Sequence, residues 1–128
     1  MKVTIEHLGI YSKDLERSIE YYEKYFGAVS NSKYVNPTGF SSYFLTFESG
    51  ARLEIMHHIN LEHRTCREME SGLSHIAFSL GSKEAVIELT EKISADGYEI
   101  FKPLRETGDG YFESCVADPD GNRVEITV

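Results

Sequence analysis

The chain contains an internal repeat, and no other feature restricts the possible folds of its 128 residues so strongly. The segment GARLEI at residues 50–55 recurs as GNRVEI at residues 121–126. The segment HLGI at residues 7–10 likewise recurs as HIAF at residues 75–78. Matching positions lie 71 residues apart in the first pair and 68 in the second, which a difference in loop length between two copies explains. The sequence therefore predicts two copies of one module.

Both copies have the same predicted order of elements. In the first, β-forming residues 3–10 predict a strand, and apolar residues at helical spacing then predict a helix that ends at Gly27. Three short strands follow, at about residues 28–35, 40–48 and 52–58.

The second copy repeats this order, with a strand at residues 73–80 and a helix capped by Ser82. Its last three strands are predicted near residues 98–101, 110–117 and 122–128. Two weaker matches also relate the copies: Tyr43–Phe44 with Tyr111–Phe112, and Thr38–Gly39 with Thr107–Gly108.

The fold class is therefore α+β, with two βαβββ modules that form curved mixed sheets around a concave site. We expect one domain over residues 1–128, with modules at about 1–59 and 73–128 and a polar linker at 60–72. One module alone is too small to cover both faces of its sheet, so the two copies should pack together.

Each module offers one histidine and one glutamate as metal ligands: His7 and Glu54 in the first, His75 and Glu125 in the second. Side chains alternate along a strand, so each glutamate points away from the apolar face formed by its neighbours. A carboxylate that faces a partly apolar interior needs a balancing charge. Two imidazoles and two carboxylates suit one divalent cation: nickel, zinc, cobalt, manganese or iron.

A strand histidine or glutamate taken singly is more often a structural or surface residue. Duplication explains the repeat, but not why both residue types persist in both copies. A rival cluster at His57, His58, His63 and Cys66 matches no defined zinc spacing and is assigned to the linker region. Cys115 is expected to be a small core residue.

Four segments resemble the landmarks of the vicinal-oxygen-chelate superfamily, which includes glyoxalases, bleomycin resistance proteins and dioxygenases. They are HLGI, which contains His7; RLEI, which contains Glu54; SHIAF, which contains His75; and DPDGNRVEI at residues 118–126, which contains Glu125. The resemblance covers the whole chain. The ligand pattern His, Glu, His, Glu is similar to that of glyoxalase I, the lactoylglutathione lyase. Extradiol dioxygenases have two histidines and one glutamate, and the related epimerase has glutamine at the position of Glu54.

Two positions depart from the bacterial glyoxalases. An arginine that contacts glutathione in those enzymes corresponds to Tyr11, and an asparagine corresponds to His58. These differences leave the thiol of the substrate open. Tyr11, His58 and Arg52 are the candidate substrate-binding residues.

The resemblance implies that a hemithioacetal of a 2-oxoaldehyde, such as methylglyoxal with glutathione or another thiol, becomes a 2-hydroxyacyl thioester through an enediolate. Glu125 would be the catalytic base, and Glu54 would act on the other side. The alternatives are a resistance-type protein that binds a small molecule without turnover, and a different metal-dependent enzyme such as an epimerase or dioxygenase.

The composition limits the partners and the cellular location that we expect for the protein. A formal net charge of −8 disfavours nucleic acid as a partner, and no apolar run approaches the length of a membrane span. With two cysteines and no recognised signal peptide, a cytoplasmic protein is expected. Family resemblance adds a homodimer to these expectations.

Overall fold

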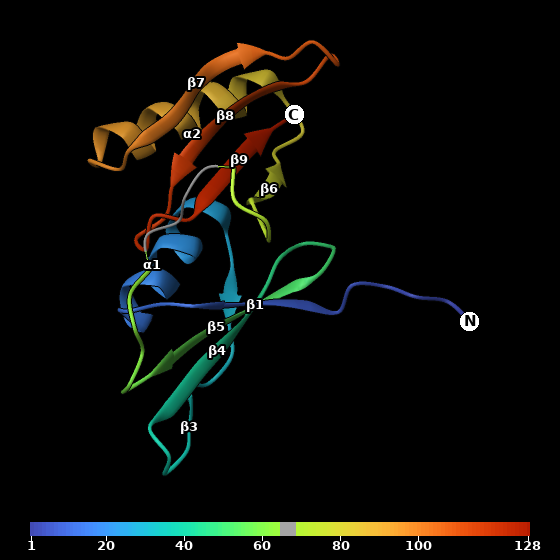
Figure 1. The fold of residues 1–128 in the computed structure, drawn as a ribbon. Coiled ribbons are helices and arrows are strands. Elements are labelled where there is room, and N and C mark those ends of the chain that lie inside the picture. The colour runs from blue at the N-terminus through green and yellow to red at the C-terminus, as the bar shows by residue number, and fades with distance from the viewer. Residues whose placement is uncertain (65–68) are drawn as a thin grey trace. The chain divides into compact units, whose positions relative to one another are not determined.

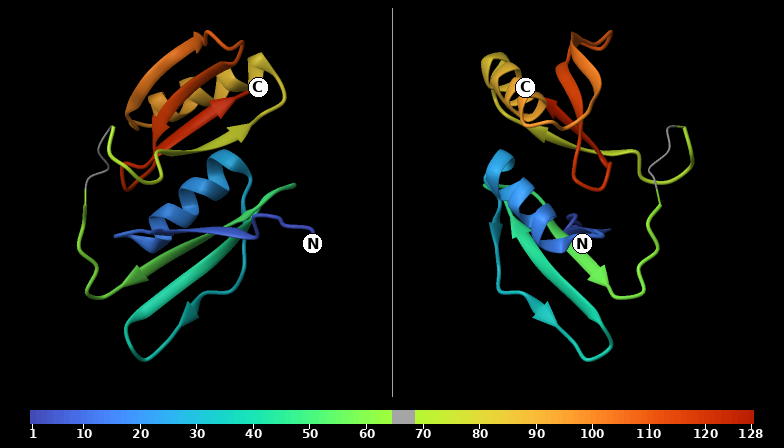
Figure 2. Two further views of the ribbon diagram at one scale, coloured as in Figure 1. Left: turned by 45° about the vertical axis from the view of Figure 1, so that its right-hand side comes forward. Right: turned by 90° about the vertical axis from the view of Figure 1, so that its left-hand side faces the viewer.

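The computed structural model describes residues 1–64 and 69–128, and the chain divides into two units, Met1–Arg64 and Thr65–Val128 (Figures 1 and 2). The predicted linker at 60–72 lies partly outside the described residues. Cys66, from the rival cluster, lies wholly outside them. Among the described residues, no helix is long and apolar enough to cross a membrane.

The first unit is a mixed sheet with one helix. The sheet order is β1-β5-β4-β2, β3 pairs with β4, and only the β1–β5 pairing is parallel. The elements are β1 (His7–Tyr11), α1 (Leu15–Phe26), β2 (Val29–Ser30), β3 (Tyr34–Val35), β4 (Phe40–Thr46) and β5 (Arg52–His58).

The second unit repeats the arrangement with the sheet order β6-β9-β8-β7, in which β6 is parallel to β9 and the other pairs are antiparallel. Its elements are β6 (His75–Ser79), α2 (Lys83–Ala95), β7 (Ile100–Glu106), β8 (Phe112–Ala117) and β9 (Arg123–Thr127). Two mixed sheets with one helix each confirm the predicted fold class.

Both helices begin at a capping side chain. Asp14 accepts a hydrogen bond from the Arg17 backbone N–H at 3.2 Å, and Ser82 accepts one from Ala85 at the same distance. Helix α1 ends at Gly27, whose φ of 64° is left-handed and favours glycine.

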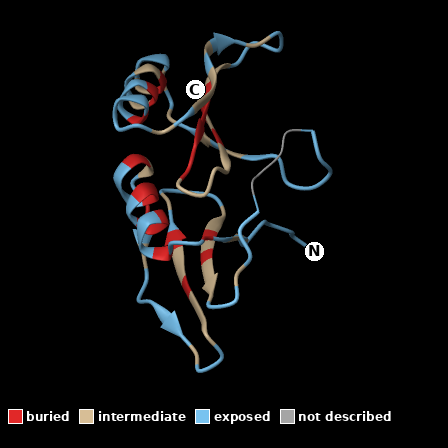
Figure 3. Cartoon of the chain, turned by 60° about the vertical axis from the view of Figure 1, so that its left-hand side comes forward, coloured by how far each residue is buried: buried red, intermediate tan, exposed pale blue. Residues whose placement is uncertain are grey.

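The core of each unit lies between its helix and one face of its sheet (Figure 3). Apolar side chains that alternate along the central strands are almost fully buried there. In the first unit these strand residues are Leu45, Leu53 and Ile55, which pack with Tyr22 of α1 in the core. In the second they are Val116, Val124 and Ile126, with Val86 and Ile93 of α2.

The strand predicted at 28–35 is two short strands, β2 and β3. The break coincides with Asn31, whose side-chain oxygen accepts a hydrogen bond from the Phe44 backbone N–H at 2.8 Å. A side chain thus replaces a backbone group at this point of the ladder. The strand predicted near 98–101 instead continues to Glu106, with register irregularities on both sides of Lys102.

The strand pairing corrects the alignment of the two copies. Glu54 lies opposite Phe44, and Glu125 lies opposite Cys115. Phe44 therefore corresponds to Cys115, and not to Phe112 as the sequence alignment proposed. The spacing between the copies is 68 residues at β1 and β6 and 71 residues from β3 onward. The second copy therefore has three more residues between β6 and the paired part of β7 than the first copy has between β1 and β3.

Candidate functional site

The two predicted glutamates occupy the sheet face opposite the helix in their own units. Leu53 and Ile55 on either side of Glu54 are 3% and 0% exposed, and Val124 and Ile126 beside Glu125 are fully buried. The side chains of Glu54 and Glu125 are each 19% exposed. Strand alternation therefore places each carboxylate on a partly enclosed face outside the apolar core.

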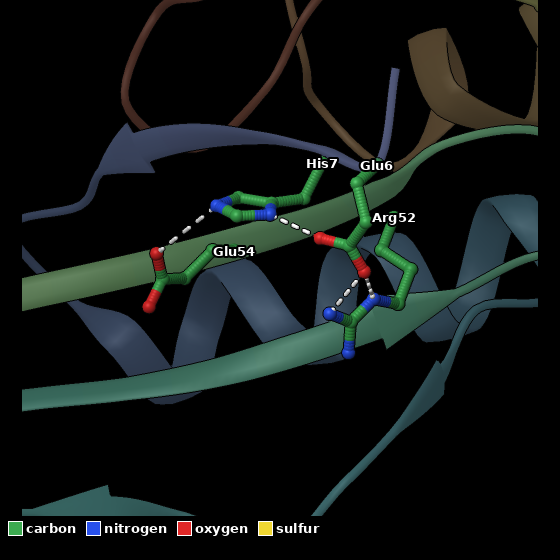
Figure 4. Close-up of polar contacts among 4 residues, drawn as sticks. All are labelled: Glu6, His7, Arg52 and Glu54. Atoms are coloured by element: carbon green, nitrogen blue, oxygen red, sulfur yellow. Dashed lines mark hydrogen bonds and ion pairs between the residues drawn. The ribbon is translucent and has the colours of Figure 1, made fainter. Parts of the chain in front are cut away.

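In the first unit, β1 and β5 bring His7 beside Glu54 (Figure 4). His7 Nε2 lies 4.0 Å from Glu54 Oε1. The other ring nitrogen, Nδ1, contacts the carboxylate of Glu6. The ring also meets the edge of Phe44, with centroids 5.3 Å apart and planes at 82°.

The second unit has the same pair on β6 and β9. His75 Nε2 lies 3.2 Å from Glu125 Oε2, and His75 Nδ1 lies 3.0 Å from the Ser74 hydroxyl. The strand registers agree as well, because Gly9 faces Glu54 and Ala77 faces Glu125. Each unit therefore carries one His–Glu pair in the same setting.

The atoms of these pairs suit a divalent cation. Two ligands at about 2.0–2.2 Å from one metal lie about 2.8–3.6 Å apart, so the 3.2 Å separation of His75 and Glu125 fits two neighbouring coordination positions. The 4.0 Å separation of His7 and Glu54 needs a small side-chain rotation. Among residues 1–64 and 69–128, no three His, Cys, Asp or Glu side chains cluster closely enough to hold a metal. Each unit thus offers two protein ligands.

Arg52 contacts two residues that adjoin His7. Its Nε donates to Glu6 Oε1 at 2.8 Å, its Nη2 contacts the same oxygen, and its guanidinium lies 4.2 Å from the centre of the Phe44 ring. The hydrogen bond from His7, together with Arg52, lowers the pKa of Glu6 below its usual range. Arg52 therefore contacts Glu6 and Phe44, which in turn both contact His7.

The second unit differs at the corresponding positions. Ser74 replaces Glu6, and Arg123 lies 4.4 Å from the centre of the Phe101 ring. The two pairs thus consist of the same residue types, but the side chains that contact each pair differ.

A pocket of about 50 Å³ opens beside the second pair. Lys102 and Cys115 lie next to Glu125 in successive strands, since Lys102 pairs with Cys115 and Cys115 with Glu125. Burial raises the pKa of the Cys115 thiol, against the opposing effect of Arg123. The residues that line the pocket are Met69, Glu70, Ser74, His75, Lys102, Cys115, Arg123 and Glu125.

The predicted substrate residues lie on β1 and β5. Tyr11, at the end of β1, is 54% exposed and pairs with Met56. His58, at the end of β5, accepts a hydrogen bond at Nδ1 from the Asn60 backbone N–H at 3.0 Å. Arg52 is engaged by Glu6, as described above.

Sequence reasoning missed Glu6 and Lys102. Glu6 directly precedes a proposed ligand, so a search for carboxylates beside each histidine would have found it. Lys102 joins the pocket through the irregular pairing of β7, and Pro103, which has no N–H to donate, is the sequence signal that could have indicated this irregularity. Cys115 was expected in the core and is 2% exposed, but its strand position places it on the glutamate side of the sheet.

The aromatic residues of the two weaker repeat matches lie in different settings. Phe44 contacts His7, whereas the Tyr43 hydroxyl donates to Glu16 at 2.9 Å. Tyr111 is 54% exposed, and the ring of Phe112 lies beneath the Lys83 ammonium at 4.5 Å.

Two repeated βαβββ units, each with a His–Glu pair on the open face of its sheet, define the class of protein. Residues 4–126 match the sequence profile of the glyoxalase/bleomycin resistance protein/dioxygenase superfamily. The chain belongs to this superfamily.

Solved structures share its fold. A glyoxylase/bleomycin resistance protein/dioxygenase domain from Frankia sp. EAN1pec has a TM-score of 0.85 at 19% identity, over 100% of this chain and 98% of that one. Glyoxalase I from Zea mays has a TM-score of 0.80 at 23% identity, over 97% of this chain and 44% of the maize chain. The trypanothione-dependent glyoxalase I of Leishmania major has a TM-score of 0.74 at 24% identity, over 98% and 86% of the two chains.

One curated relative, the uncharacterized protein YqjT of Bacillus subtilis, is 38% identical over 68 residues. The match covers 51% of this chain and 51% of YqjT, so it spans about half the length of that relative.

Proposed function

We propose that this protein is a metal-dependent lyase of the glyoxalase I type. Its substrate would be the hemithioacetal of a 2-oxoaldehyde, such as methylglyoxal joined to glutathione or another thiol. The observation that carries the proposal is the recurrence of one His–Glu pair at the same strand register in both units. Glyoxalase I structures from maize and Leishmania share the fold.

The proposed cofactor is one divalent cation, nickel, zinc, cobalt, manganese or iron, held by His7, Glu54, His75 and Glu125. Nitrogen and carboxylate ligands suit these metals, and two carboxylates balance the charge of the ion. When bound, the cation would act as a Lewis acid that polarises the substrate oxygens and makes the adjacent C–H more acidic.

Glu125 is the proposed base. It would remove the proton from the carbon that carries the sulfur and return it to the neighbouring carbonyl carbon. The hydroxyl hydrogen of the hemithioacetal would move to the former carbonyl oxygen, which completes the conversion to a 2-hydroxyacyl thioester. The position of Glu125 beside the pocket supports this role, because substrate carbon atoms have room there. Glu54 would serve the opposite face of the substrate.

The pocket also suggests the charge of the substrate. Among the described residues, the Lys102 ammonium has no hydrogen-bond or ion-pair partner, and the side chain lines the pocket together with Arg123. Two cationic side chains there would favour a thiol conjugate with an anionic group. Tyr11, Arg52 and His58 are proposed to contact the substrate on the side of the first unit. We further propose a homodimer that acts in the cytoplasm.

The test is thioester formation from methylglyoxal and glutathione by protein that has been stripped of metal and reloaded with nickel, cobalt or zinc. Absorbance at the thioester band gives the rate, and elemental analysis gives the bound metal. Metal-dependent turnover supports the proposal. Stoichiometric metal without turnover for a panel of thiols and 2-oxoaldehydes would instead support a binding protein of the resistance type.

A further inference from the structure

We propose that Glu6 is a positioning residue that fixes the tautomer and orientation of His7. The inference rests on the proposed function in so far as His7 is a metal ligand. It concerns a group that does not itself contact the metal: Glu6 receives the Nδ1 hydrogen of His7, and Arg52 holds Glu6 in place (Figure 4).

The first step of the argument is the chemistry of the contact. An ionised carboxylate only accepts hydrogen bonds, so the ring nitrogen that faces Glu6 must carry the hydrogen. A neutral imidazole has one N–H, and its other nitrogen, Nε2, then keeps a free lone pair. That nitrogen lies 4.0 Å from Glu54, which is too far for a hydrogen bond between them. Nε2 is thus left available as a ligand atom.

The second step is the support of Glu6. Its carboxylate is 60% exposed and would be mobile alone, but Arg52 Nε donates to it at 2.8 Å. The Arg52 guanidinium is itself stacked over Phe44 at 4.2 Å, and the same ring meets the edge of His7. Phe44 therefore braces both the arginine and the imidazole.

The third step is the internal comparison. Ser74 stands in the place of Glu6, and its hydroxyl lies 3.0 Å from His75 Nδ1. A hydroxyl can donate or accept, so it does not select a tautomer. His75 Nε2 lies 3.2 Å from Glu125 Oε2, within ion-pair distance but without a hydrogen bond that would hold the hydrogen on Nε2. The two histidines are therefore inequivalent: a carboxylate holds the hydrogen of His7 on Nδ1, whereas the hydroxyl beside His75 leaves its tautomer unselected.

The consequence concerns metal affinity. His7 already presents the lone pair of Nε2 to a cation, whereas nothing beside His75 selects the tautomer that would do so. A carboxylate behind a ligating histidine also raises the basicity of the ring, and loss of such a partner typically weakens metal binding about 10- to 100-fold. We expect Glu6→Ala to weaken nickel binding about tenfold or more on this basis. Ser74→Ala, the matched change in the second unit, should weaken it less.

The experiment reads the tautomer directly. Two-dimensional ¹H–¹⁵N spectra of metal-free protein labelled at histidine, recorded near pH 8, separate protonated from unprotonated ring nitrogens. We expect Nδ1–H for His7 in the wild type and in Glu6→Gln, which keeps an oxygen acceptor. Glu6→Ala should shift His7 towards a mixture, and Ser74→Ala should leave His7 unchanged. Far-UV circular dichroism confirms that each variant is folded.

Nickel affinity is then measured by competition with a chelating dye. An Nδ1–H form of His7 that persists unchanged in Glu6→Ala would overturn the inference, whatever the metal affinity. Equal losses of affinity in Glu6→Ala and Ser74→Ala would also overturn it. Wild-type protein that binds none of nickel, zinc, cobalt, manganese and iron but shows the expected His7 tautomer would refute the proposed metal function and leave the positioning of His7 by Glu6 established.

Discussion

Glu54 and Glu125 occupy equivalent strand positions, but their surroundings differ. Phe44 lies across from Glu54, whereas Cys115 lies across from Glu125 and leaves space for the pocket. The aromatic ring of Phe44 therefore occupies, in the first unit, the position that the smaller Cys115 side chain takes in the second. This difference supports the proposal that Glu125 is the base, because Glu125 lines the pocket of the second unit.

Glu125→Gln should therefore abolish turnover while it preserves the fold and much of the bound metal. The amide has nearly the same shape and keeps an oxygen ligand, but it is not a base at neutral pH. We expect kcat to fall about 10²- to 10⁴-fold, the usual contribution of a positioned general base. Steady-state kinetics with measured metal content test this.

Glu54→Gln is the matched comparison, since it makes the same change at the equivalent strand position. It should reduce kcat less than Glu125→Gln does. Full activity in Glu125→Gln at unchanged metal content would remove Glu125 from the role of base.

Cys115 gives a second prediction at the scale of the residue. Burial raises the pKa of its thiol, so the reactive thiolate is scarcer at a given pH than in an exposed cysteine. In a Cys66→Ser background, where Cys115 is the remaining cysteine, Ellman's reagent at pH 8 should react at least tenfold more slowly with folded than with denatured protein. Equal rates in the folded and denatured states would show that the thiol is accessible and unperturbed.

At the scale of the element, the turn between β8 and β9 sets the position of Glu125. Asp118 is 3% exposed, and its Oδ1 accepts hydrogen bonds from the backbone N–H groups of Asp120 and Asn122 at 2.9 and 2.8 Å. Its Oδ2 accepts another from the Asn122 side chain at 2.8 Å. One carboxylate therefore satisfies three donors in the strand connection that precedes the proposed base.

Asp118→Ala should lower the free energy of unfolding by about 2–4 kcal/mol, because three donors in a partly buried turn lose their buried acceptor. Urea denaturation followed by circular dichroism measures the change. Asp109→Ala is the control: Asp109 accepts from Thr107 in the exposed turn before β8, and its loss should cost less than about 1 kcal/mol. A similar cost for both variants would contradict the structural role of Asp118.

The elements themselves were largely predictable, because the repeat and the alternation of apolar residues are local signals. Both helices and the last strand of each unit fall where the pattern places them. The break between β2 and β3 was not predictable, since it depends on the Asn31 side chain replacing a ladder partner. The alignment of Phe44 with Phe112 failed for a related reason: similarity of two letters does not report strand register.

The candidate site divides in the same way. His7, Glu54, His75 and Glu125 could be proposed from the repeat, and their joint role stays a prediction. Glu6 was overlooked because its part depends on the path of the Arg52 side chain. Lys102 was overlooked because irregular pairing in β7 brings it opposite Cys115.

At the scale of the whole molecule, the proposed centre needs both units, since each contains only two ligands of the set. A cation bound by folded protein and not by the unfolded chain stabilises the fold by RT ln(1 + [L]/Kd), about 4 kcal/mol at a free metal concentration of 1,000 times Kd. Removal of the metal should therefore lower the thermal midpoint, and readdition of nickel should restore it. Differential scanning calorimetry on stripped and reloaded protein measures both changes.

The stoichiometry decides whether the two pairs act together. One shared cation predicts one metal per chain in the wild type, and it predicts that His7→Ala and His75→Ala each lose most of the metal-dependent shift of the thermal midpoint. Two independent pairs predict up to two metals per chain, with one retained in each variant, because the untouched His–Glu pair would still bind. Titration with nickel separates these outcomes. Two metals per chain, or a shift that survives in either variant, would contradict the four-ligand centre even if the protein were active.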